Sequence, residues 1–225
     1  MSPPIDEFAR VTLSGAKNAS DGSAPSREQI DRVVRYLKSP GSGVDAGSSF
    51  EDFVRDRLGA NPARLPDGHT YVAFSGANSS GQSNFKAALD YAEAHRGRAG
   101  IIGDTPWGSF IDSPNARAEL RPMADRLAVG LQREGLLPRG GQTVAALQDM
   151  MWNAGSPEFA RNAMQSGRPV VAFVDGAPVG RGFSTFELPV VQQFPDGVVN
   201  GQRVASFGTG ADALDRARQS AVTYA

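Results

Sequence analysis

The stretch "PVVAFVDG", residues 169–176, indicates most clearly what kind of fold this chain adopts. It is a nearly continuous apolar run that ends in an Asp-Gly pair, which is typical of a short strand followed by a turn. A second run, "HTYVAFSG" at residues 69–76, has the same character. Strands without polar alternation lie in sheets that are covered on both faces, and such sheets are mostly parallel. The two runs therefore predict a small buried sheet flanked by helices.

Helices are expected around these strands. "SREQIDRVVRYLKS" (26–39) has apolar residues at helical spacing, and Ser26 with Gln29 forms a capping-box pattern. "SSFEDFVRDRLGAN" (48–61) also has apolar residues at helical spacing, and Ser48 with Glu51 forms its capping-box pattern. Further helical patterns cover residues 84–97, 115–135, 143–167, with an interruption at Gly155–Pro157, and 211–222.

Three other segments are harder to assign from their composition. "FSTFELPVV" (183–191) and "QRVASFG" (202–208) are predicted to be strands, because aromatic and β-branched residues favour extended structure. "AGIIGDTPWGSFIDSP" (99–114) contains many Gly and Pro residues, and it predicts irregular structure.

The pattern as a whole predicts an α/β protein with two lobes, a helix-rich N-terminal part and a small C-terminal, largely parallel β-sheet flanked by helices. Residues 1–25 end in small polar residues and are expected to form a flexible segment, and residues 26–225 one domain. The expected helical lobe is about 26–68 and 84–165, and the sheet lobe is about 69–83 and 166–225. Ligands of open α/β sheets bind beside the strand ends.

The charge and composition exclude several classes of protein. The 225 residues include 23 basic and 24 acidic ones, and their scatter argues against a nucleic-acid surface. There is no cysteine and there are only two histidines, so no metal site is expected. No run approaches the roughly 20 apolar residues of a membrane span. The N-terminus lacks a basic, apolar leader, so we expect synthesis in the cytoplasm without a cleaved signal.

Four unusual segments fall at the ends of predicted elements, where binding residues gather. They are "FSGANSSGQSN" (74–84), "GDTPWGSFID" (103–112), "WNAGS" (152–156) and "GRGFSTFE" (180–187). The first contains small residues after a strand, which suits close approach of phosphates to backbone amides, although a mobile loop would look the same.

The residues in these segments each have a structural alternative. Glu187 is either a solvent-facing residue of an edge strand or an acid whose side chain points into a cleft. Ser156 shares a helix face with Trp152, and it either contacts ligand or caps a new helix that has Pro157 at its first position. Asp104 either serves the site or only caps its own turn, beside a packed Trp107.

Taken in order, these segments resemble the ADP-ribosyl cyclase family, which includes NAD glycohydrolases, and in particular bacterial toxin domains without disulfides. The resemblance covers roughly residues 65 to 195. The matching positions lie at the end of the first strand, in a Thr-Pro-Trp-Gly turn, in a Trp-x-x-x-Ser motif and at a late acid: Phe74, Ser75, Asp104, Thr105, Gly108, Asp112, Trp152, Ser156, Phe159, Ala160 and Glu187.

The chain departs from the family pattern at three places. Phe74 stands where the family has Trp, and Trp107 is a candidate to supply the missing aromatic surface. Gly103 replaces an acid that bears on the choice between hydrolysis and cyclisation. Pro157 follows Ser156 directly, and a helix break at this proline would change the orientation of Ser156.

The resemblance implies an NAD⁺ glycohydrolase that yields ADP-ribose and nicotinamide, with a minor cyclase product. Glu187 would be the catalytic carboxylate, Ser156 would bond the ribose, and Trp152 and Phe74 would hold the nicotinamide. The other implied substrate-binding residues are Ser75, Gly76, Asp104, Thr105, Trp107, Asp112, Phe183 and Ser184. NAD⁺ is the substrate, no metal or cofactor is implied, and NADP⁺ is a second candidate substrate.

The toxin branch further implies export by a specialised secretion system, action in a target cell's cytoplasm, and a cognate immunity protein. Two alternatives remain open at this point. One is a glycan-cleaving cell-wall hydrolase, in which Glu187 pairs with Asp104 or Asp112. The other is a non-enzymatic binding module, in which Glu187 is a solvated strand residue.

Overall fold

The computed structural model describes residues 13, 16–38, 57–137, 143–180, 182–209 and 211–220. These residues are mixed α/β, about half of them helical. They divide into two compact units, and each unit joins segments that are distant in the sequence. The first unit comprises Met1–Pro62 and Ser109–Ala154, and the second comprises Ala63–Gly108 and Gly155–Ala225.

The second unit contains a three-stranded parallel sheet. Its central strand β2 (Thr70–Phe74) lies between β3 (Ala99–Gly100) and β5 (Val171–Phe173). Val72 is in register with Val171, and Phe74 with Phe173. The two apolar runs therefore form strands, and they pair in parallel as the sequence predicts.

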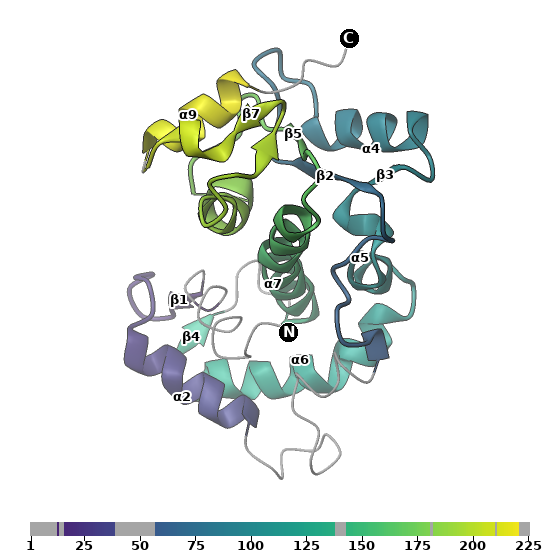
Figure 1. The fold of residues 1–225 in the computed structure, drawn as a ribbon. Helices are drawn as coiled ribbons and strands as arrows, with labels where there is room; N and C mark the ends of the chain where they lie inside the picture. Colours follow the sequence, from purple (N-terminus) through teal and green to yellow (C-terminus); the bar gives the residue numbers. More distant parts are fainter. Residues whose placement is uncertain are drawn as a thin grey trace. The chain divides into compact units, whose positions relative to one another are not determined.

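Helix α4 (Asn84–Ala94) covers one face of this sheet, as Figure 1 shows. Its side chains Ala88 and Ala92 join Val72 and Phe173 in one buried apolar cluster. The small residues on this helix face allow a close approach to the side chains of the strands. Helix and sheet thus belong to one unit, although the sequence predicts residues 84–94 in the helical lobe.

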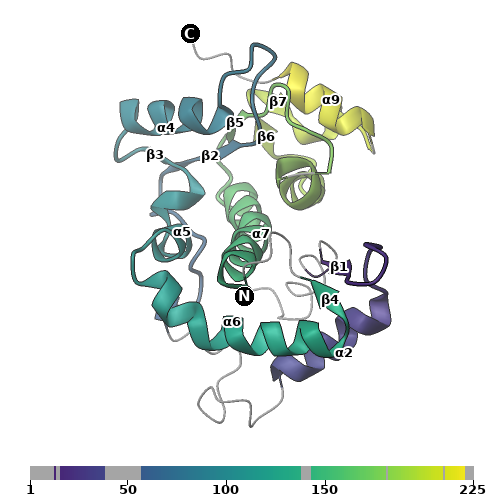
Figure 2. The ribbon, with the colours of Figure 1, turned by 180° about the vertical axis from the view of Figure 1, so that it is seen from behind.

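A hairpin follows the sheet strands and is docked on β5. Strands β6 (Val198–Val199) and β7 (Gln202–Arg203) are joined by Asn200 and Gly201, which both have positive φ. This Asn-Gly pair is the preferred chemistry for a two-residue hairpin turn. The Asn200 side chain accepts from Ala172 N at 2.8 Å and donates to Ala172 O at 2.9 Å. Figure 2 shows β6 beside β5.

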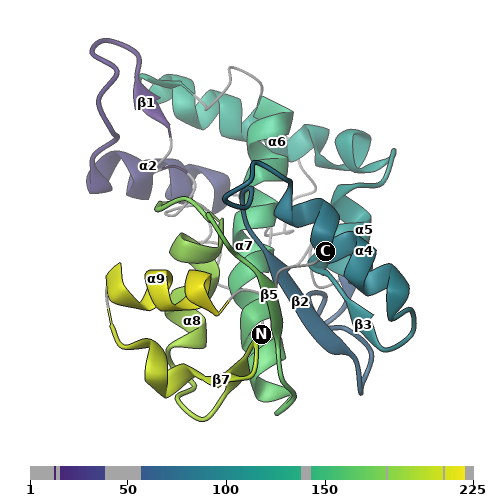
Figure 3. The same ribbon diagram turned by 90° about the horizontal axis from the view of Figure 1, so that it is seen from above.

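Two helices complete the second unit on the β5 side of its sheet (Figure 3). They are α8 (Leu188–Val191) and α9 (Ala211–Gln219). Arg218 of α9 donates from Nε to Ala177 O at 2.9 Å, and Nη2 bonds the same oxygen. The C-terminal helix therefore fastens the loop that follows β5.

The first unit is mainly two packed helices, α2 (Arg27–Lys38) and α6 (Ala116–Arg133). The predicted capping box is confirmed, because Ser26 Oγ accepts from Gln29 N at 3.2 Å and Gln29 Oε1 accepts from Ser26 N at 2.8 Å. α6 continues through Pro122. Buried leucines of α6, among them Leu120 and Leu127, form its inner face.

A short antiparallel pair joins the segment before α2 to the segment after α6. β1 (Lys17–Asn18) pairs with β4 (Leu136–Leu137). β1 lies within residues 1–25, which the sequence predicts as a flexible segment. Gln29 Nε2 of α2 donates to Asn18 Oδ1 at 2.8 Å, so this described part is tied into the first unit.

The predicted strand at residues 183–191 is wrong. Phe183–Glu187 form a π-helical turn that runs directly into α8. Pro189 cannot donate to a sheet ladder but fits the first turn of a helix. The residues buried along this segment recur at helical rather than alternating spacing; they are Phe183, Glu187, Leu188, Val190 and Val191.

The predicted interruption at Gly155–Pro157 is also wrong. α7 (Thr143–Gln165) is one helix with Pro157 inside it. A proline in a helix interior costs about 3 kcal/mol, but tertiary burial decides most helices. Phe159, Ala160 and Met164, all beyond the proline, are buried and supply that packing.

Residues 99–114 are more regular than predicted. They contain β3, a 3₁₀ helix Ile102–Asp104 and α5 (Pro106–Ile111). In contrast, of the strand predicted at 202–208 only β7 is extended, and a 3₁₀ helix Val204–Phe207 follows it. The helix predicted at 48–61 lies outside the described residues except for 57–61. In the described ranges, no helix combines the length and the apolar character that crossing a membrane requires.

Candidate active site

Glu187 is buried at the end of the π-helical turn. The residue is only 7% exposed, so neither its strand assignment nor the solvent-facing alternative holds. The turn begins after Gly182, whose φ of 38° and ψ of −110° suit glycine alone. π-Helical turns are rare and are found frequently at functional sites.

The Glu187 carboxyl has an incomplete set of partners. It accepts a hydrogen bond from the Ser156 side chain. Its Oε2 atom is buried and has no hydrogen-bond partner among the described residues. Burial raises the pKa of Glu187 from its ordinary value of 4.5 to about 8, and the Ser156 bond opposes that rise. Glu187 is therefore mostly protonated at neutral pH in the unliganded protein.

Ser156 is held in place by the packing of α7 against Trp107. The residue before it is Gly155, and a Cβ there would lie 2.5 Å from Trp107 Nε1. Only glycine permits this approach. Because the helix continues through Pro157, Ser156 is a mid-helix residue and does not cap a new helix.

Trp107 is a core residue at 1% exposure, which agrees with the packed-tryptophan interpretation of its turn. The turn is closed by Thr105, whose Oγ1 donates to Ile102 O at 2.6 Å and accepts from Gly108 N at 3.2 Å. Asp104 Oδ2 accepts from Ile101 N at 2.8 Å. Asp104 thus caps its own turn, Thr105 closes that turn, and Trp107 packs against α7 at Gly155.

The end of β2 forms a second part of the site. Ser75 is buried, and its N–H extends the sheet by donating to Phe173 O at 3.1 Å. The buried Asn84 side chain donates to Ser75 O at 2.7 Å and to Asp175 O at 2.8 Å. Asn84 therefore ties together the loops that follow β2 and β5.

The loop after β5 meets this strand end at two glycines. A Cβ on Gly182 would lie 2.9 Å from Ser75 Oγ, and a Cβ on Gly76 would lie 2.6 Å from Pro178 Cδ. Ser184 Oγ donates to Pro178 O at 3.1 Å. The structure thus brings together four of the predicted substrate-binding residues: Ser75, Gly76, Phe183 and Ser184.

The predicted aromatic walls differ in exposure. Phe74 is half-buried, and its ring lies 5.0 Å from the ring of the exposed Phe85. Phe183 is buried in the core, so it can offer a ligand only its backbone. Phe74 is the aromatic that remains accessible at the end of β2.

The other two predicted site residues, Trp152 and Asp112, belong to the first unit. Trp152 is half-buried and Asp112 is exposed. Trp152 lies one helical turn before Ser156 on the continuous helix α7, so the two share a helix face. That Trp152 faces Glu187 across a substrate remains a prediction.

Two polar groups of the second unit were missed in the sequence. Asn84 stands at a predicted helix start, but its burial depends on two loops that meet only in the fold. The buried Glu158 forms an ion pair with the half-buried Arg161 three residues along α7, and that spacing is a usable helical signal.

No group of three or more acidic, histidine or cysteine side chains in the described part of the chain could hold a metal ion. The site therefore consists of a buried acid, a hydroxyl, and a strand end with nearby backbone groups. Searches of protein-family models, curated proteins and solved structures found no match to this chain.

Proposed function

We propose that this protein is an NAD⁺ glycohydrolase, in which Glu187 is the catalytic residue. The observation that carries the proposal is the buried Glu187 carboxyl, which has a hydroxyl beside it and, among the residues that the structure describes, no cation. A buried carboxyl group of this kind ionises at little cost only when a ligand brings a positive charge next to it. NAD⁺ supplies this positive charge, first on its nicotinamide ring and then, as the nicotinamide–ribose bond breaks, on the ribose carbon.

The chemistry needs a carboxylate rather than an acid. The C–N bond breaks with its electron pair leaving on the pyridinium nitrogen, so the departing nicotinamide is neutral without protonation. The ribose carbon becomes oxocarbenium-like, and water then adds to it and loses a proton. A preorganised carboxylate stabilises that positive centre.

Substrate binding would itself ionise Glu187. An opposite charge within about 4–6 Å favours the charged form of a carboxyl group and lowers its pKa. The cationic nicotinamide ribose would therefore lower the pKa of Glu187 from about 8, and the proton would pass to solvent. Because Glu187 is buried, the side chains over it have to move aside as the substrate enters.

The neighbouring groups have corresponding roles in the proposal. Ser156 would orient the carboxylate and bond the ribose. The backbone at Ser75, Gly76 and Ser184 would meet the pyrophosphate, because backbone amides at a strand end suit phosphate oxygens. Phe74, at the end of β2, would hold the nicotinamide ring.

The proposal includes membership of the ADP-ribosyl cyclase fold, in its toxin branch without cysteines. The gathering of Ser75, Ser156 and Glu187 in one unit supports this assignment. One feature differs from the resemblance, since Glu187 lies on a helical turn where the family pattern implies a strand.

The direct test is release of nicotinamide from NAD⁺ by the purified protein, followed by chromatography. Wild type should release nicotinamide in an amount equal to the sum of ADP-ribose and a minor cyclic ADP-ribose product. Absence of nicotinamide at high enzyme concentration, from pH 6 to pH 9, would contradict the proposal. The same assay with NADP⁺ determines which of the two dinucleotides is the preferred substrate.

A second candidate, glycan cleavage, is favoured by one observation. A carboxyl group that stays protonated at neutral pH is what a glycosidase uses to protonate its leaving oxygen. This candidate needs a second carboxylate. In the same unit Asp104 is engaged in capping Ile101 N, and Glu158 is paired with Arg161. Release of soluble fragments from peptidoglycan, with NAD⁺ untouched, would select it.

The biological part of the proposal is a secreted toxin that depletes NAD⁺ in a target cell and is neutralised by an immunity protein in the producer. It follows from the proposed chemistry and the resemblance. Induced expression in a bacterial cytoplasm should lower cellular NAD⁺ and arrest growth, and Glu187→Gln should do neither. Normal growth and NAD⁺ content with soluble wild-type protein would contradict it.

A further inference from the structure

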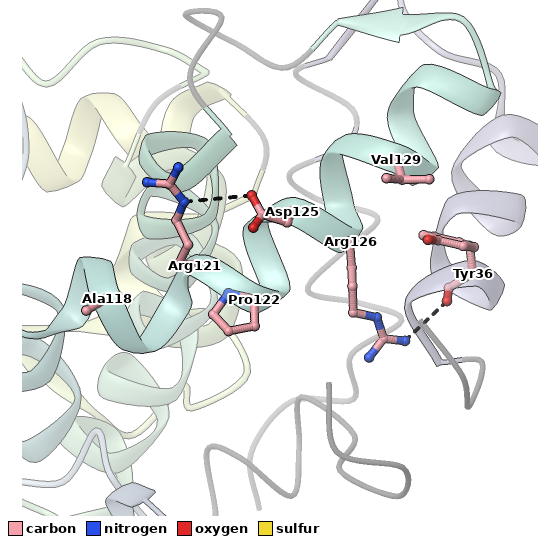
Figure 4. Close-up of a pocket in the computed structure, with 7 residues that line it drawn as sticks. All are labelled: Tyr36, Ala118, Arg121, Pro122, Asp125, Arg126 and Val129. Atoms are coloured by element: carbon pink, nitrogen blue, oxygen red, sulfur yellow. Dashed lines mark hydrogen bonds and ion pairs between the residues drawn. The ribbon is translucent and has the colours of Figure 1, made fainter. Parts of the chain in front are cut away.

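A cavity of about 470 Å³ lies in the first unit, between α2 and α6, and Figure 4 shows the residues that line it. Its lining combines the guanidinium groups of Arg121 and Arg126 with the carboxylate of Asp125 and with apolar surface. Charges of both signs favour no single class of ligand. The strand ends of the second unit, where the pyrophosphate of NAD⁺ would bind, are chemically more specific.

Two loops meet at the carboxyl ends of the parallel strands. The β2 loop comprises residues 75–83, and the described residues of the β5 loop are 174–180 and 182. Asn84 is 4% exposed, and its Nδ2 donates to a backbone oxygen of each loop, Ser75 O at 2.7 Å and Asp175 O at 2.8 Å. These bonds use both amide protons of Asn84, so one side chain sets the separation of the two loops.

The two loops also touch through their glycines. A Cβ on Gly176 would lie 2.5 Å from Ala77 O, and a Cβ on Gly76 would lie 2.6 Å from Pro178 Cδ. Each loop thus contributes a glycine that lies against the other loop, and a larger residue would push the loops apart. Close approach of one backbone to another is a common reason for glycine.

Further hydrogen bonds hold the β2 loop in its shape. Asn78 Oδ1 accepts from Ser80 N at 3.0 Å and from Gln82 N at 2.8 Å. Asp175 Oδ2 accepts from Ser79 N at 3.2 Å and from Ser79 Oγ at 3.0 Å. The β2 loop is therefore held by one of its own side chains and by the β5 loop.

The β5 loop leads directly into the turn that carries Glu187. Ser184 Oγ of that turn donates to Pro178 O at 3.1 Å, and a Cβ on Gly182 would lie 2.9 Å from Ser75 Oγ. The distance between the strand-end backbone and Glu187 therefore depends on how the two loops are joined.

A pyrophosphate at these loops would be bound by dipoles. Residues 75–83 and 174–180 include no lysine or arginine. The available donors are backbone amides and hydroxyl groups, and their hydrogen bonds weaken steeply when distance or direction is wrong. Binding through such donors depends more on the exact placement of the loops than binding through a mobile cation would.

We propose that Asn84 is a positioning residue for the pyrophosphate of NAD⁺, and that it makes the enzyme favour a dinucleotide over a riboside. It would act through the carbonyl groups of Ser75 and Asp175, without touching the substrate. The role rests on the proposed cleavage of NAD⁺ and extends it, because binding energy from the distant pyrophosphate would be used at the nicotinamide ribose.

The test compares NAD⁺ with nicotinamide riboside, which has the same scissile bond but no pyrophosphate. Nicotinamide release by the full chain gives kcat/KM for each substrate. Wild type should cleave the riboside less efficiently than NAD⁺, because a truncated substrate loses remote binding energy. Asn84→Ala should lower kcat/KM for NAD⁺ about 10- to 100-fold, and it should lower kcat/KM for the riboside by much less.

Two further variants separate positioning from stability. Asn200→Gly is the matched control, because Asn200 also makes two side-chain bonds to backbone, to Ala172 N and Ala172 O, and its φ of 50° suits glycine. It should leave the ratio of the two kcat/KM values unchanged. Gly176→Ala keeps Asn84 but sets a methyl group against Ala77 O, so it should also lower the ratio. It decides the matter if Asn84→Ala does not fold.

The outcomes distinguish this role from the proposed function. Equal proportional losses for NAD⁺ and the riboside in folded Asn84→Ala would mean that Asn84 supports only the fold. Equal kcat/KM of the two substrates in wild type would mean that the pyrophosphate is not recognised. Either result leaves NAD⁺ cleavage standing, whereas a wild type that is inactive on both substrates removes the proposed function and the role of Asn84 with it.

Discussion

Two buried glutamates of the second unit, Glu158 on α7 and Glu187 on the π-helical turn, differ in what surrounds them. They are 8% and 7% exposed, so burial does not distinguish them. Glu158 is bonded to Arg161, one turn along the same helix. In the described part of the chain, Glu187 is bonded to the Ser156 hydroxyl, and its Oε2 has no partner there.

The difference separates a structural acid from a candidate catalytic one. A buried carboxylate beside a guanidinium is compensated within the fold. A buried carboxyl without a cation keeps its proton until a ligand supplies the missing charge. The identity of the partner, rather than the depth of burial, therefore indicates which glutamate is available for chemistry.

The largest expected effect is on NAD⁺ cleavage. Glu187→Gln should lower the rate of nicotinamide release by about 10²–10³, because a preorganised group that stabilises the transition state is lost. Glu158→Gln is the matched control and should stay near the wild-type rate. If the Glu158 variant loses as much activity as the Glu187 variant, with both folded, the distinction between the two acids fails.

The next effect is on stability as a function of pH. Between the unfolded pKa of 4.5 and the folded pKa of about 8, the unfolded chain has released the Glu187 proton and the folded chain retains it. Raising the pH through this window therefore favours unfolding, by up to about 1.4 kcal/mol for each pH unit. Glu187→Gln removes this loss, so it should gain stability relative to wild type from pH 5 to pH 8.

Urea unfolding of wild type and Glu187→Gln at pH 5 and at pH 8 measures this difference in the free energy of unfolding. Glu187→Gln should raise the free energy of unfolding, whereas Glu158→Gln should lower it at neutral pH, because Arg161 loses its partner. Parallel pH profiles for wild type and Glu187→Gln would mean that Glu187 titrates normally.

A smaller effect is expected from the packing that positions Ser156. Gly155→Ala should destabilise the fold by about 1–3 kcal/mol, because the new methyl group meets the Trp107 ring. Gly103→Ala is a suitable control, since the nearest atom there is the flexible Ile101 Cδ1 at 3.3 Å. Equal thermal melting of the two variants would show that α7 does not depend on this approach.

The smallest effect is expected from Ser156→Ala. The Ser156 hydrogen bond lowers the pKa of Glu187, so its loss should raise that pKa further. The pH profile of kcat/KM for NAD⁺ should then move to higher pH. A variant with unchanged profile and reduced kcat would assign Ser156 to the ribose alone.

The sheet could be predicted because its signals are local. "TYVAF" and "VVAF" are apolar runs bounded by glycine, proline and polar residues, and both became paired strands. The Ser26–Gln29 box likewise depends on four consecutive residues. Such features are set by neighbours in the sequence and need no knowledge of the fold.

The surroundings of Glu187 could not be predicted in the same way. "FSTFE" has the composition of a strand, but Gly182 and Pro189 at its two sides favour a helical turn. The continuity of α7 through Pro157 depends on burial of Phe159 and Met164, which is a tertiary effect. Both errors concern residues beside the proposed catalytic acid, where local preference and packing disagree.

The most direct measurement of the central claim is a carbon-13 NMR titration of the glutamate carboxyl groups, with Glu187→Gln used to assign the signal of Glu187. One carboxyl signal should titrate near pH 8, vanish in the variant, and move to lower pH when a cationic nicotinamide riboside analogue is added. A Glu187 signal that titrates near 4.5 in the free protein would contradict the account.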